Sequence, residues 1–125
     1  MDERFRGLGV ALVTPFRDNG QIDYAGLERL IEHQITGGVD YVVTMGTTGE
    51  SVTLTKEEKH QLLAQTILFV RNRVPVVLGV GGNNTAEVIE SLQSFEMDGV
   101  DAILSVSPYY NKPTQEGIYQ HYKAI

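Results

Sequence analysis

The chain has 125 residues, of which 42% are hydrophobic, and its formal net charge is -6 at pH 7. This length is enough for one domain with a buried core. The ten Lys and Arg residues are scattered, so the chain lacks the basic face that nucleic acid or an anionic membrane requires, and we expect neither as a partner. Because cysteine is absent, disulfides, thiolate nucleophiles and cysteine-ligated zinc are excluded.

The amino terminus gives no sign of a targeting segment. Residues 1–6 carry both signs of charge, and the apolar run after them stops at Thr14-Pro15. That run is too short for a signal peptide or a membrane span, so the cytoplasm is the predicted location. His33, His60 and His121 are widely separated, so we expect no metal site and interpret all three as ordinary residues on helix surfaces.

Continuous apolar runs alternate with amphipathic segments along the chain. The runs cover residues 8–13, 41–43, 76–80 and 102–106. Runs without polar alternation are typical of strands buried on both faces of a parallel sheet. We therefore predict parallel strands that are neighbours in chain order, with a helix after each one.

Capping residues mark where the helices begin. The predicted starts are Asp23, the capping box Thr55-Lys56-Glu57-Glu58, Asn84 with Glu87, and Thr114. Glycines are predicted to end the first helix at Gly37-Gly38 and the third at Gly99. The residues expected to face the core are Leu27, Leu30, Ile31 and Ile35 in the first helix, Leu63, Ile67 and Val70 in the second, and Val88, Leu92 and Phe95 in the third.

One short pattern occurs twice, at residues 38–43 and 99–104, each time where a helix returns to a strand. The separation equals two units of about thirty residues, which is the size of a βαβ step. The repeat therefore indicates an α/β fold of four parallel βα units.

The first polar motif is Gly46-Thr47-Thr48-Gly49-Glu50-Ser51, directly after a predicted strand. Its glycines permit a tight turn with exposed N–H groups, and its threonine hydroxyls can donate to a carboxylate or relay a proton. Taken alone, the motif favours a tight turn whose polar groups satisfy their own backbone, because short glycine-bounded motifs match by chance.

The second motif is Ser107-Pro108-Tyr109-Tyr110-Asn111-Lys112-Pro113, after another predicted strand. Its prolines stiffen the loop that carries the two phenols. Each tyrosine taken singly favours packing on the core. Both motifs would lie at the carboxyl ends of the strands, where α/β barrels carry their chemistry.

A doubly wound nucleotide-binding fold would place ligands at the same ends of its strands. Gly79-Val80-Gly81-Gly82 is similar to its fingerprint, but Asn84 stands where a glycine should be. The chain also has no Gly-Lys-Ser/Thr phosphate loop, so we do not favour a nucleotide site.

Together the two motifs resemble the dihydrodipicolinate synthase family, and the likeness extends from Gly9–Phe16 to Glu116–Ile125. N-acetylneuraminate lyases share the Thr-Gly-Glu part but not both motifs. The resemblance implies a (β/α)8 TIM barrel, which needs about 250 residues. Residues 1–125 are then expected to be the amino-terminal half of that domain.

The resemblance also implies the chemistry: a lyase that condenses pyruvate with aspartate semialdehyde in lysine and diaminopimelate biosynthesis. Pyruvate forms a Schiff base with a lysine, and no separate cofactor is implied. Thr47 and Thr48 would hold the pyruvate carboxylate, and Thr47 would pass a proton to Tyr110. In the family, the residue that matches Tyr110 reaches into the neighbouring subunit's site. The implied partner is a further copy, in tetramers of tight dimers.

The family's lysine-feedback site maps onto Ser51, Lys56, Lys59, Asn83, Glu87 and Tyr109. In strongly inhibited members of the family, histidines stand at the positions of Lys56 and Lys59. An added cation repels the ammonium groups of a lysine effector, so the resemblance implies weak feedback. The alternative for both lysines is a solvated first turn of a helix.

The Schiff-base lysine is expected to lie beyond Ile125, since Lys56, Lys59, Lys112 and Lys123 do not match its position. We therefore expect the chain alone to lack synthase activity. One alternative is a self-associating half-barrel with a structural role. Another is a sister aldolase such as N-acetylneuraminate lyase, which the intact Tyr109-Tyr110-Asn111 disfavours.

Overall fold

Four parallel strands form the centre of the molecule. The computed structural model describes residues 2–125, in which the sheet order is β1-β2-β3-β4. The strands are β1 (Gly9–Ala11), β2 (Tyr41–Thr44), β3 (Val76–Gly79) and β4 (Ala102–Leu104). Every neighbouring pair is parallel, as predicted. Strands β1 and β4 are shorter than the apolar runs that predicted them, because Val13 and Val106 at the ends of these two runs lie beyond the paired segments and are about half exposed.

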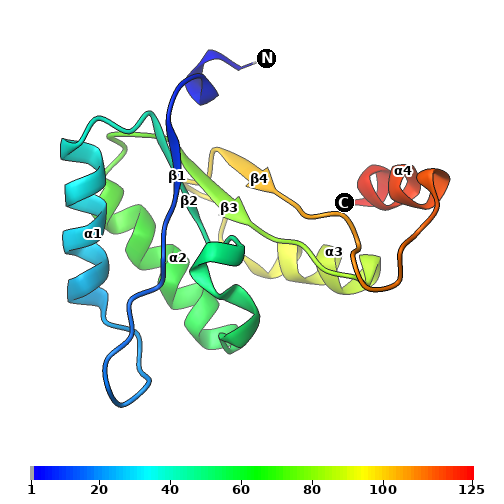
Figure 1. The fold of residues 1–125 in the computed structure, drawn as a ribbon, viewed down its shortest axis with the longest axis horizontal. Coiled ribbons are helices and arrows are strands. Elements are labelled where there is room, and N and C mark those ends of the chain that lie inside the picture. Colours follow the sequence, from blue (N-terminus) through cyan, green and yellow to red (C-terminus); the bar gives the residue numbers. More distant parts are fainter. Residues whose placement is uncertain (1) are drawn as a thin grey trace.

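A helix follows each strand, which confirms the predicted alternation. The helices are α1 (Tyr24–Thr36), α2 (Lys56–Val70), α3 (Thr85–Ser94) and α4 (Gln115–Ala124). Helices α1 and α2 pack side by side, and α4 lies at the opposite end of the molecule (Figure 1). This is the arrangement of half a (β/α)8 barrel. No helix in residues 2–125 is both long and apolar enough to cross a membrane.

The main core lies between the sheet and the helices. Val42 and Leu78 of the strands are fully buried with Leu27 and Ile31 of α1 and Leu62 of α2. Each such side chain contributes about 1.5–3 kcal/mol by leaving water. The predicted inward faces are confirmed: Leu27, Ile31, Leu63, Val70, Val88 and Phe95 are buried, and Leu30, Ile35, Ile67 and Leu92 are partly buried against the same cluster.

Both edges of the sheet are open. Within residues 2–125, β1 and β4 each pair with one neighbour only. Apolar side chains near these edges are exposed, among them Leu8 at 58% and Leu104 at 54%. An open edge with apolar surface beside it is a place where another chain segment can pair.

The two copies of the repeated sequence form the same structure. Their opening glycines have φ values of +87° and +84°, a left-handed conformation that suits glycine where a helix turns into a strand. The aspartate two residues after each glycine accepts a hydrogen bond from a backbone N–H at the start of the neighbouring strand. The Leu8 N–H donates to Asp40 Oδ2 at 2.6 Å, and the Val76 N–H donates to Asp101 Oδ2 at 2.9 Å. The repeat is therefore present in the structure as well as in the sequence.

Three helix starts agree with the prediction. The Thr55 hydroxyl accepts from the Glu58 N–H at 3.2 Å, and the Glu58 carboxylate accepts from the Thr55 N–H at 2.8 Å, which completes the capping box. The side chains of Asn84 and Thr114 also accept hydrogen bonds from the first turns of α3 and α4. Such caps each stabilise a helix by about 1 kcal/mol.

Asp23 occupies the N-cap position of α1, but its side chain makes no capping hydrogen bond, so this detail of the prediction is wrong. Its carboxylate instead lies 3.9 Å from the Arg17 guanidinium and 3.8 Å from that of Arg29. The two arginines are the ionic partners that the carboxylate has, and a capping pattern in the sequence does not include them.

The third helix ends at Ser94, with Phe95 as its C-cap, and not at Gly99 as predicted. The chain leaves the helix before it reaches the glycine, and Gly99 serves the return to β4. A Cβ placed on Gly99 would lie 2.7 Å from Ile67 Cγ2 of α2. The glycine is therefore explained by close packing against α2 and by its positive φ, not by a helix end.

His121 is buried, so the prediction that all three histidines lie on helix surfaces is wrong. Its side chain is 3% exposed, and Nδ1 lies 2.8 Å from the Thr85 hydroxyl at the start of α3. The residue therefore links α4 to α3. His33 is exposed as expected, and His60 is partly buried with its ring 4.8 Å from that of Phe95.

Candidate functional site

The first motif forms two consecutive tight turns at the carboxyl end of β2. Residues Thr47–Gly49 and Ser51–Thr53 are short 3-10 helices, and Met45 and Glu50 beside them have φ values of +54° and +55°. The Gly49 N–H donates to the Gly46 carbonyl at 3.0 Å. The Thr14 hydroxyl, which follows β1, donates to the Gly49 carbonyl at 2.6 Å. The turn is thus fastened to the neighbouring βα unit.

Thr47 and Thr48 lie on the outer side of this turn and are exposed. Within the described residues the hydroxyls of Thr47 and Thr48 have no hydrogen-bond partner. By contrast, the hydroxyl oxygens of the buried residues Thr44 and Thr66 lie 3.4 Å from each other. Two adjacent exposed hydroxyls on a glycine-bounded turn can donate to an anion. The expected carboxylate-binding pair is therefore accessible to a ligand.

The second motif forms an extended loop between β4 and α4 that is anchored by the loop after β3. The Asn83 side-chain oxygen accepts from the Tyr109 N–H at 3.1 Å, and the Asn83 carbonyl accepts from the Asn111 side chain at 3.4 Å. The Ser107 and Tyr122 hydroxyls lie 3.1 Å apart. Three consecutive βα loops, after β2, β3 and β4, therefore gather at one end of the sheet.

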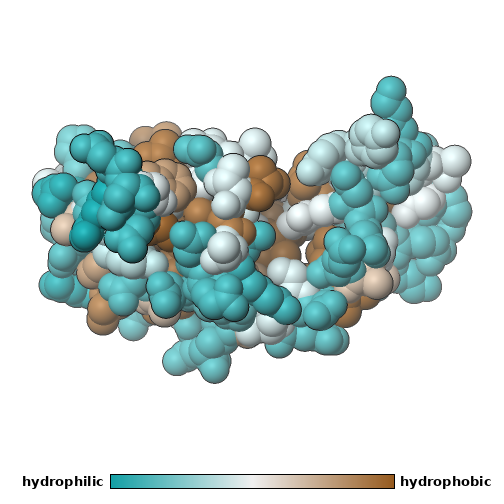
Figure 2. Space-filling view, turned by 90° about the horizontal axis from the view of Figure 1, so that it is seen from below, coloured by the Kyte–Doolittle hydropathy of each residue, from teal (hydrophilic) through white to brown (hydrophobic). Residues whose placement is uncertain are grey.

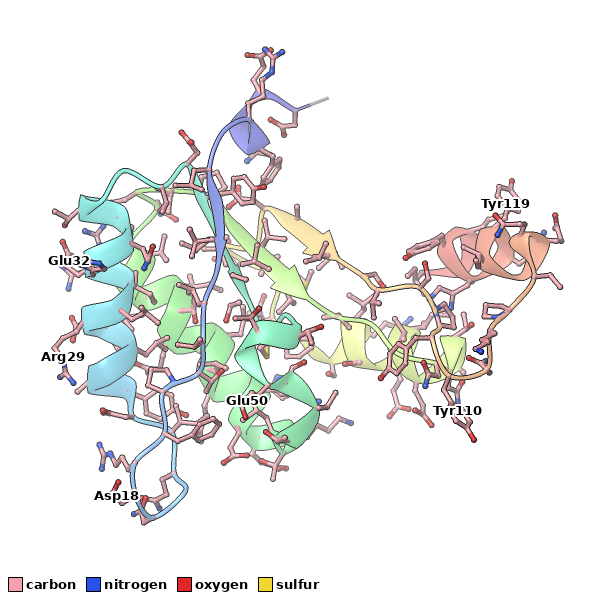
Figure 3. The ribbon with its side chains drawn as sticks, in the orientation of Figure 1. Asp18, Arg29, Glu32, Glu50, Tyr110 and Tyr119 are labelled. Carbon is pink, nitrogen blue, oxygen red and sulfur yellow. The ribbon has the colours of Figure 1, made fainter. Side chains whose placement is uncertain are left out.

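The two tyrosines of this loop take different positions. Tyr109 lines a cavity with the first motif, whereas Tyr110 is 85% exposed and extends away from it (Figure 3). Neither ring is packed in the core, so the alternative of buried packing is wrong for both. The structure of a single chain brings Thr47 and Tyr109 together and leaves Tyr110 apart.

The cavity between the loops has a volume of about 460 Å³. Polar groups of Thr47, Ser51 and Tyr109 border it, and its remaining lining comes mainly from glycines and apolar side chains. Figure 2 views the molecule from the carboxyl ends of the strands and shows hydrophobic surface in a hollow near the middle of this face. An apolar hollow with a few polar groups is typical of a small-molecule site.

The residues expected from the lysine-feedback resemblance divide into two groups. Ser51 and Tyr109 line the same cavity, and Lys59 borders a smaller recess of about 50 Å³ that shares Ser51. Asn83 holds the Tyr109 backbone. Glu87 accepts from the Asn84 side chain at 3.1 Å, and Lys56 lies 3.7 Å from the Glu90 carboxylate. Glu87 and Lys56 therefore border neither the cavity nor the recess.

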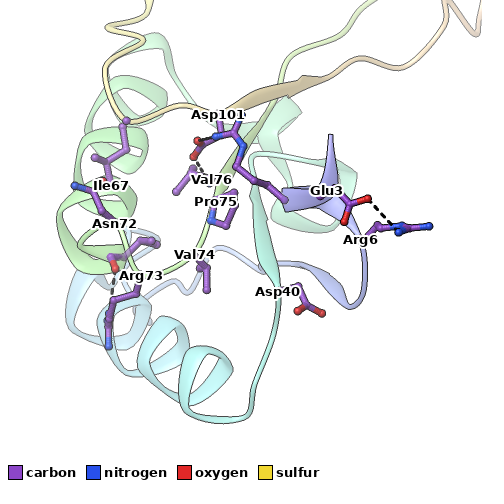
Figure 4. Close-up of a pocket in the computed structure, with 13 residues that line it drawn as sticks. Glu3, Arg6, Asp40, Ile67, Asn72, Arg73, Val74, Pro75, Val76 and Asp101 are labelled. Atoms are coloured by element: carbon purple, nitrogen blue, oxygen red, sulfur yellow. Dashed lines mark hydrogen bonds and ion pairs between the residues drawn. The ribbon is translucent and has the colours of Figure 1, made fainter. Parts of the chain in front are cut away.

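A second cavity, of about 510 Å³, opens at the amino ends of the strands (Figure 4), and sequence patterns give no sign of it. Its charges are mostly paired: Arg4 with Asp101, Arg6 with Glu3, and Arg73 with Glu32 outside the cavity. Hydrogen bonds from Arg4 also hold the pKa of the nearby Asp2 carboxyl below its ordinary value. Paired charges leave little free binding capacity, so we assign the candidate site to the carboxyl-end cavity.

No group of three His, Asp or Glu side chains in the described part of the chain is arranged to hold a metal ion. The polar residues that line the site, Thr47, Ser51 and Tyr109, carry hydroxyls and a phenol. Such groups can donate hydrogen bonds to an organic anion and can relay a proton.

Comparison with known proteins gives concordant results. The model of the dihydrodipicolinate synthetase family matches residues 4–125. The 4-hydroxy-tetrahydrodipicolinate synthase of Parabacteroides distasonis is 54% identical over 124 residues, which are 99% of this chain and 42% of that protein. The chain therefore spans about 40% of the length of the relatives it matches.

Solved structures of synthases superimpose closely. The chloride-inhibited enzyme of Acinetobacter baumannii, complexed with pyruvate, has a TM-score of 0.90 at 47% identity, over 94% of this chain and 40% of that one. The enzyme of Cyanidioschyzon merolae with lysine bound has a TM-score of 0.91 at 40% identity, over 99% of this chain and 42% of that one.

Proposed function

The chain belongs to the dihydrodipicolinate synthase family, and from that premise we propose that residues 1–125 form the pyruvate-carboxylate side of a site that condenses pyruvate with aspartate semialdehyde. The observation that carries this proposal is the pair of exposed hydroxyls of Thr47 and Thr48, on a glycine-bounded turn at the carboxyl end of β2. Thr47, but not Thr48, lines the 460 Å³ cavity, which has room for both small substrates.

The turn can hold the carboxylate of pyruvate both before and during the condensation. Pyruvate keeps its carboxylate throughout, so donors fixed by the turn can hold it while the ketone carbon reacts with a lysine amine. The resulting iminium makes the methyl group acidic, and loss of a proton gives the enamine that attacks the aldehyde. Thr47 is proposed to donate to the carboxylate and to pass a proton onward, because a hydroxyl both donates and accepts.

Tyr110 is proposed to complete the proton relay in the site of a second copy. Its 85% exposure and its direction away from the cavity of its own chain support this role. A tyrosine that reaches across an interface makes catalysis dependent on association, so the proposed active form is a homo-oligomer.

We propose that no lysine of this chain is the Schiff-base nucleophile. A nucleophilic lysine needs a desolvated setting that lowers its pKa. Lys56, Lys112 and Lys123 are exposed, and Lys59 is partly buried at the edge of the small recess. Pyruvate with borohydride should therefore leave the mass of the isolated chain unchanged, and stoichiometric addition to a lysine would contradict this assignment.

Lysine feedback is proposed at the group formed by Ser51, Asn83 and Tyr109 beside the cavity. A relative of the same fold was solved with lysine bound, which supports lysine as a ligand of this fold. Lys59 adds a positive charge at the edge of the adjoining recess, and Lys56 is nearby on the first turn of α2. Repulsion between like charges predicts weak inhibition by lysine, and half-inhibition at low micromolar lysine in an enzyme that carries this segment would contradict it.

The function can be tested in a hybrid enzyme. Residues 1–125 replace the matching segment of the Parabacteroides distasonis synthase, which is 54% identical there. The hybrid enzyme should condense pyruvate with aspartate semialdehyde and should reject sugar-acid aldehydes. A folded hybrid that prefers a sugar-acid aldehyde would make the chain a sister aldolase, and one that is inactive with both would contradict the proposal.

A further inference from the structure

The third βα unit touches both motif loops through two glycines. β3 lies between β2 and β4 in the sheet. A Cβ placed on Gly79 would lie 2.6 Å from the Met45 carbonyl carbon and 2.7 Å from the Gly46 nitrogen, and nearer still to the Met45 carbonyl oxygen. These are backbone atoms of the first motif's turn, so a side chain at Gly79 would push that turn away.

Gly81 has the same relation to the second motif loop. A Cβ there would lie 2.8 Å from the Val106 nitrogen and 2.8 Å from Val106 Cγ1. Val106 directly precedes Ser107, where the second motif begins. The two glycines are separated by one residue, and each faces a different neighbouring loop.

Neither glycine is needed for its backbone conformation. The glycines with positive φ in residues 2–125 are at positions 7, 20, 38 and 99, so Gly79 and Gly81 have conformations that other residues adopt. Glycine is therefore required at both positions because a Cβ has no room there, and not because of the φ value. Both glycines also line the 460 Å³ cavity.

The contact at Gly79 lies against an unusual piece of backbone. Met45 has a φ of +54°, which sterics disfavour for a residue with a side chain. Its side chain is 3% exposed in the core, and its carbonyl faces Gly79. Packing on both sides of Met45 thus fixes the direction in which Gly46 and Thr47 leave the strand.

We propose that Gly79 and Gly81 are positioning residues that set the separation of the two motif loops across the cavity. Gly79 determines how far the Thr47 turn stands from β3, and Gly81 determines how far the tyrosine loop stands from it. The kinetic consequence rests on the proposed function, because it requires the turn to hold pyruvate and the loop to carry the relay tyrosine. The structural consequence does not depend on that function.

The structural test uses crystal structures of the 125-residue chain with Gly79→Ala, Gly81→Ala and Gly82→Ala. Gly82 is the matched control, since its Cβ would lie 3.4 Å from Val88 Cγ2. Gly79→Ala should move residues 45–47 by about 1 Å relative to β3, and Gly81→Ala should move residues 106–109 by a similar amount, which is the scale that matters for catalysis. Unmoved loops in both variants would overturn the proposal.

The kinetic test uses the hybrid enzyme. Gly79→Ala should raise the pyruvate KM about tenfold or more, while Gly81→Ala should lower kcat about tenfold and leave the pyruvate KM within about twofold. Gly82→Ala should change neither. A purely structural role would reduce the amount of folded enzyme without raising KM in one variant and lowering kcat in the other. Equal KM and equal kcat per folded site in all three variants would therefore overturn the proposal.

A fourth variant covers the case in which the glycine-to-alanine variants do not fold. Val106→Ala removes the side chain that packs on Gly81 from a residue that is 48% exposed. It should fold normally and lower kcat with an unchanged pyruvate KM, and an unchanged kcat would overturn the role of Gly81. If the unsubstituted hybrid enzyme is inactive, the proposed function fails, and the crystal structures still decide the positioning role.

Discussion

Thr47 combines a structural role with a proposed chemical role. Its carbonyl accepts from the Glu50 N–H at 3.0 Å and closes the turn, while the residue is exposed and lines the cavity. The backbone part of this arrangement does not need the hydroxyl. The hydroxyl can therefore be removed without loss of the turn.

Thr47→Val in the hybrid enzyme should lower kcat by about 10²-fold or more, because it removes the proposed proton relay with little change in volume. The free energy of unfolding should change by less than about 1 kcal/mol, since the residue is exposed. Thr36→Val, on the exposed end of α1, is the control. Turnover near that of the control would contradict the relay assignment.

Tyr110→Phe should reduce kcat to a similar degree as Thr47→Val, because both hydroxyls belong to the same proposed relay. Tyr119→Phe is the matched control, since Tyr119 is also exposed, at 58%. Steady-state kinetics measure kcat for the two variants. Equal rates for the Tyr110 and Tyr119 variants would remove Tyr110 from the relay.

The site residues show what sequence patterns can predict. The position of Thr47 and Thr48 after a buried strand follows from local order, and the structure places them there. Tyr110 is exposed, whereas Tyr109 lines the cavity and its N–H donates to Asn83, 26 positions away in the chain. No local pattern contains that partner, so the separation of the two rings could not be predicted.

At the scale of elements, local signals predicted the starts of helices and missed features set by contacts between elements. The Thr55 capping box lies within four residues and was correct. The glycine that was predicted to end α3 packs against Ile67 of α2, and the buried His121 contacts Thr85 at the start of α3. The strand order could be predicted because βα units of this length connect neighbouring parallel strands.

The repeated aspartates suggest a test of the sheet. Asp101→Ala should lower the free energy of unfolding by about 1–3 kcal/mol, because the buried end of β3 loses the acceptor for the Val76 N–H. Asp98→Ala, three residues earlier and exposed, is the control. Urea unfolding measures the difference in the free energy of unfolding between the two variants. Equal midpoints would show that the hydrogen bond from β3 to Asp101 does not stabilise the sheet.

The whole molecule has two open sheet edges and an exposed apolar face on the same half-barrel. Burial of apolar surface gains about 25 cal/mol per Å². Two copies related by a twofold axis could place β4 of one beside β1 of the other and bury both edges. The geometry therefore favours association of the 125-residue chain.

We expect the chain to form dimers or larger assemblies at micromolar concentration, because this association covers the edges and the apolar face together. Sedimentation equilibrium measures the mass directly. A folded species that remains at the chain mass of 13.8 kDa across the concentration range would show that the edges are stable in water.

The central claim is that the turn Gly46–Ser51 holds the carboxylate of pyruvate. A crystal structure of the hybrid enzyme, trapped with pyruvate by borohydride, tests it most directly. We expect the pyruvate carboxylate at the turn, with an oxygen about 2.7–3.0 Å from the hydroxyl of Thr47 and of Thr48. A trapped adduct whose carboxylate lies away from this turn, with both hydroxyls more than about 4 Å distant, would contradict it.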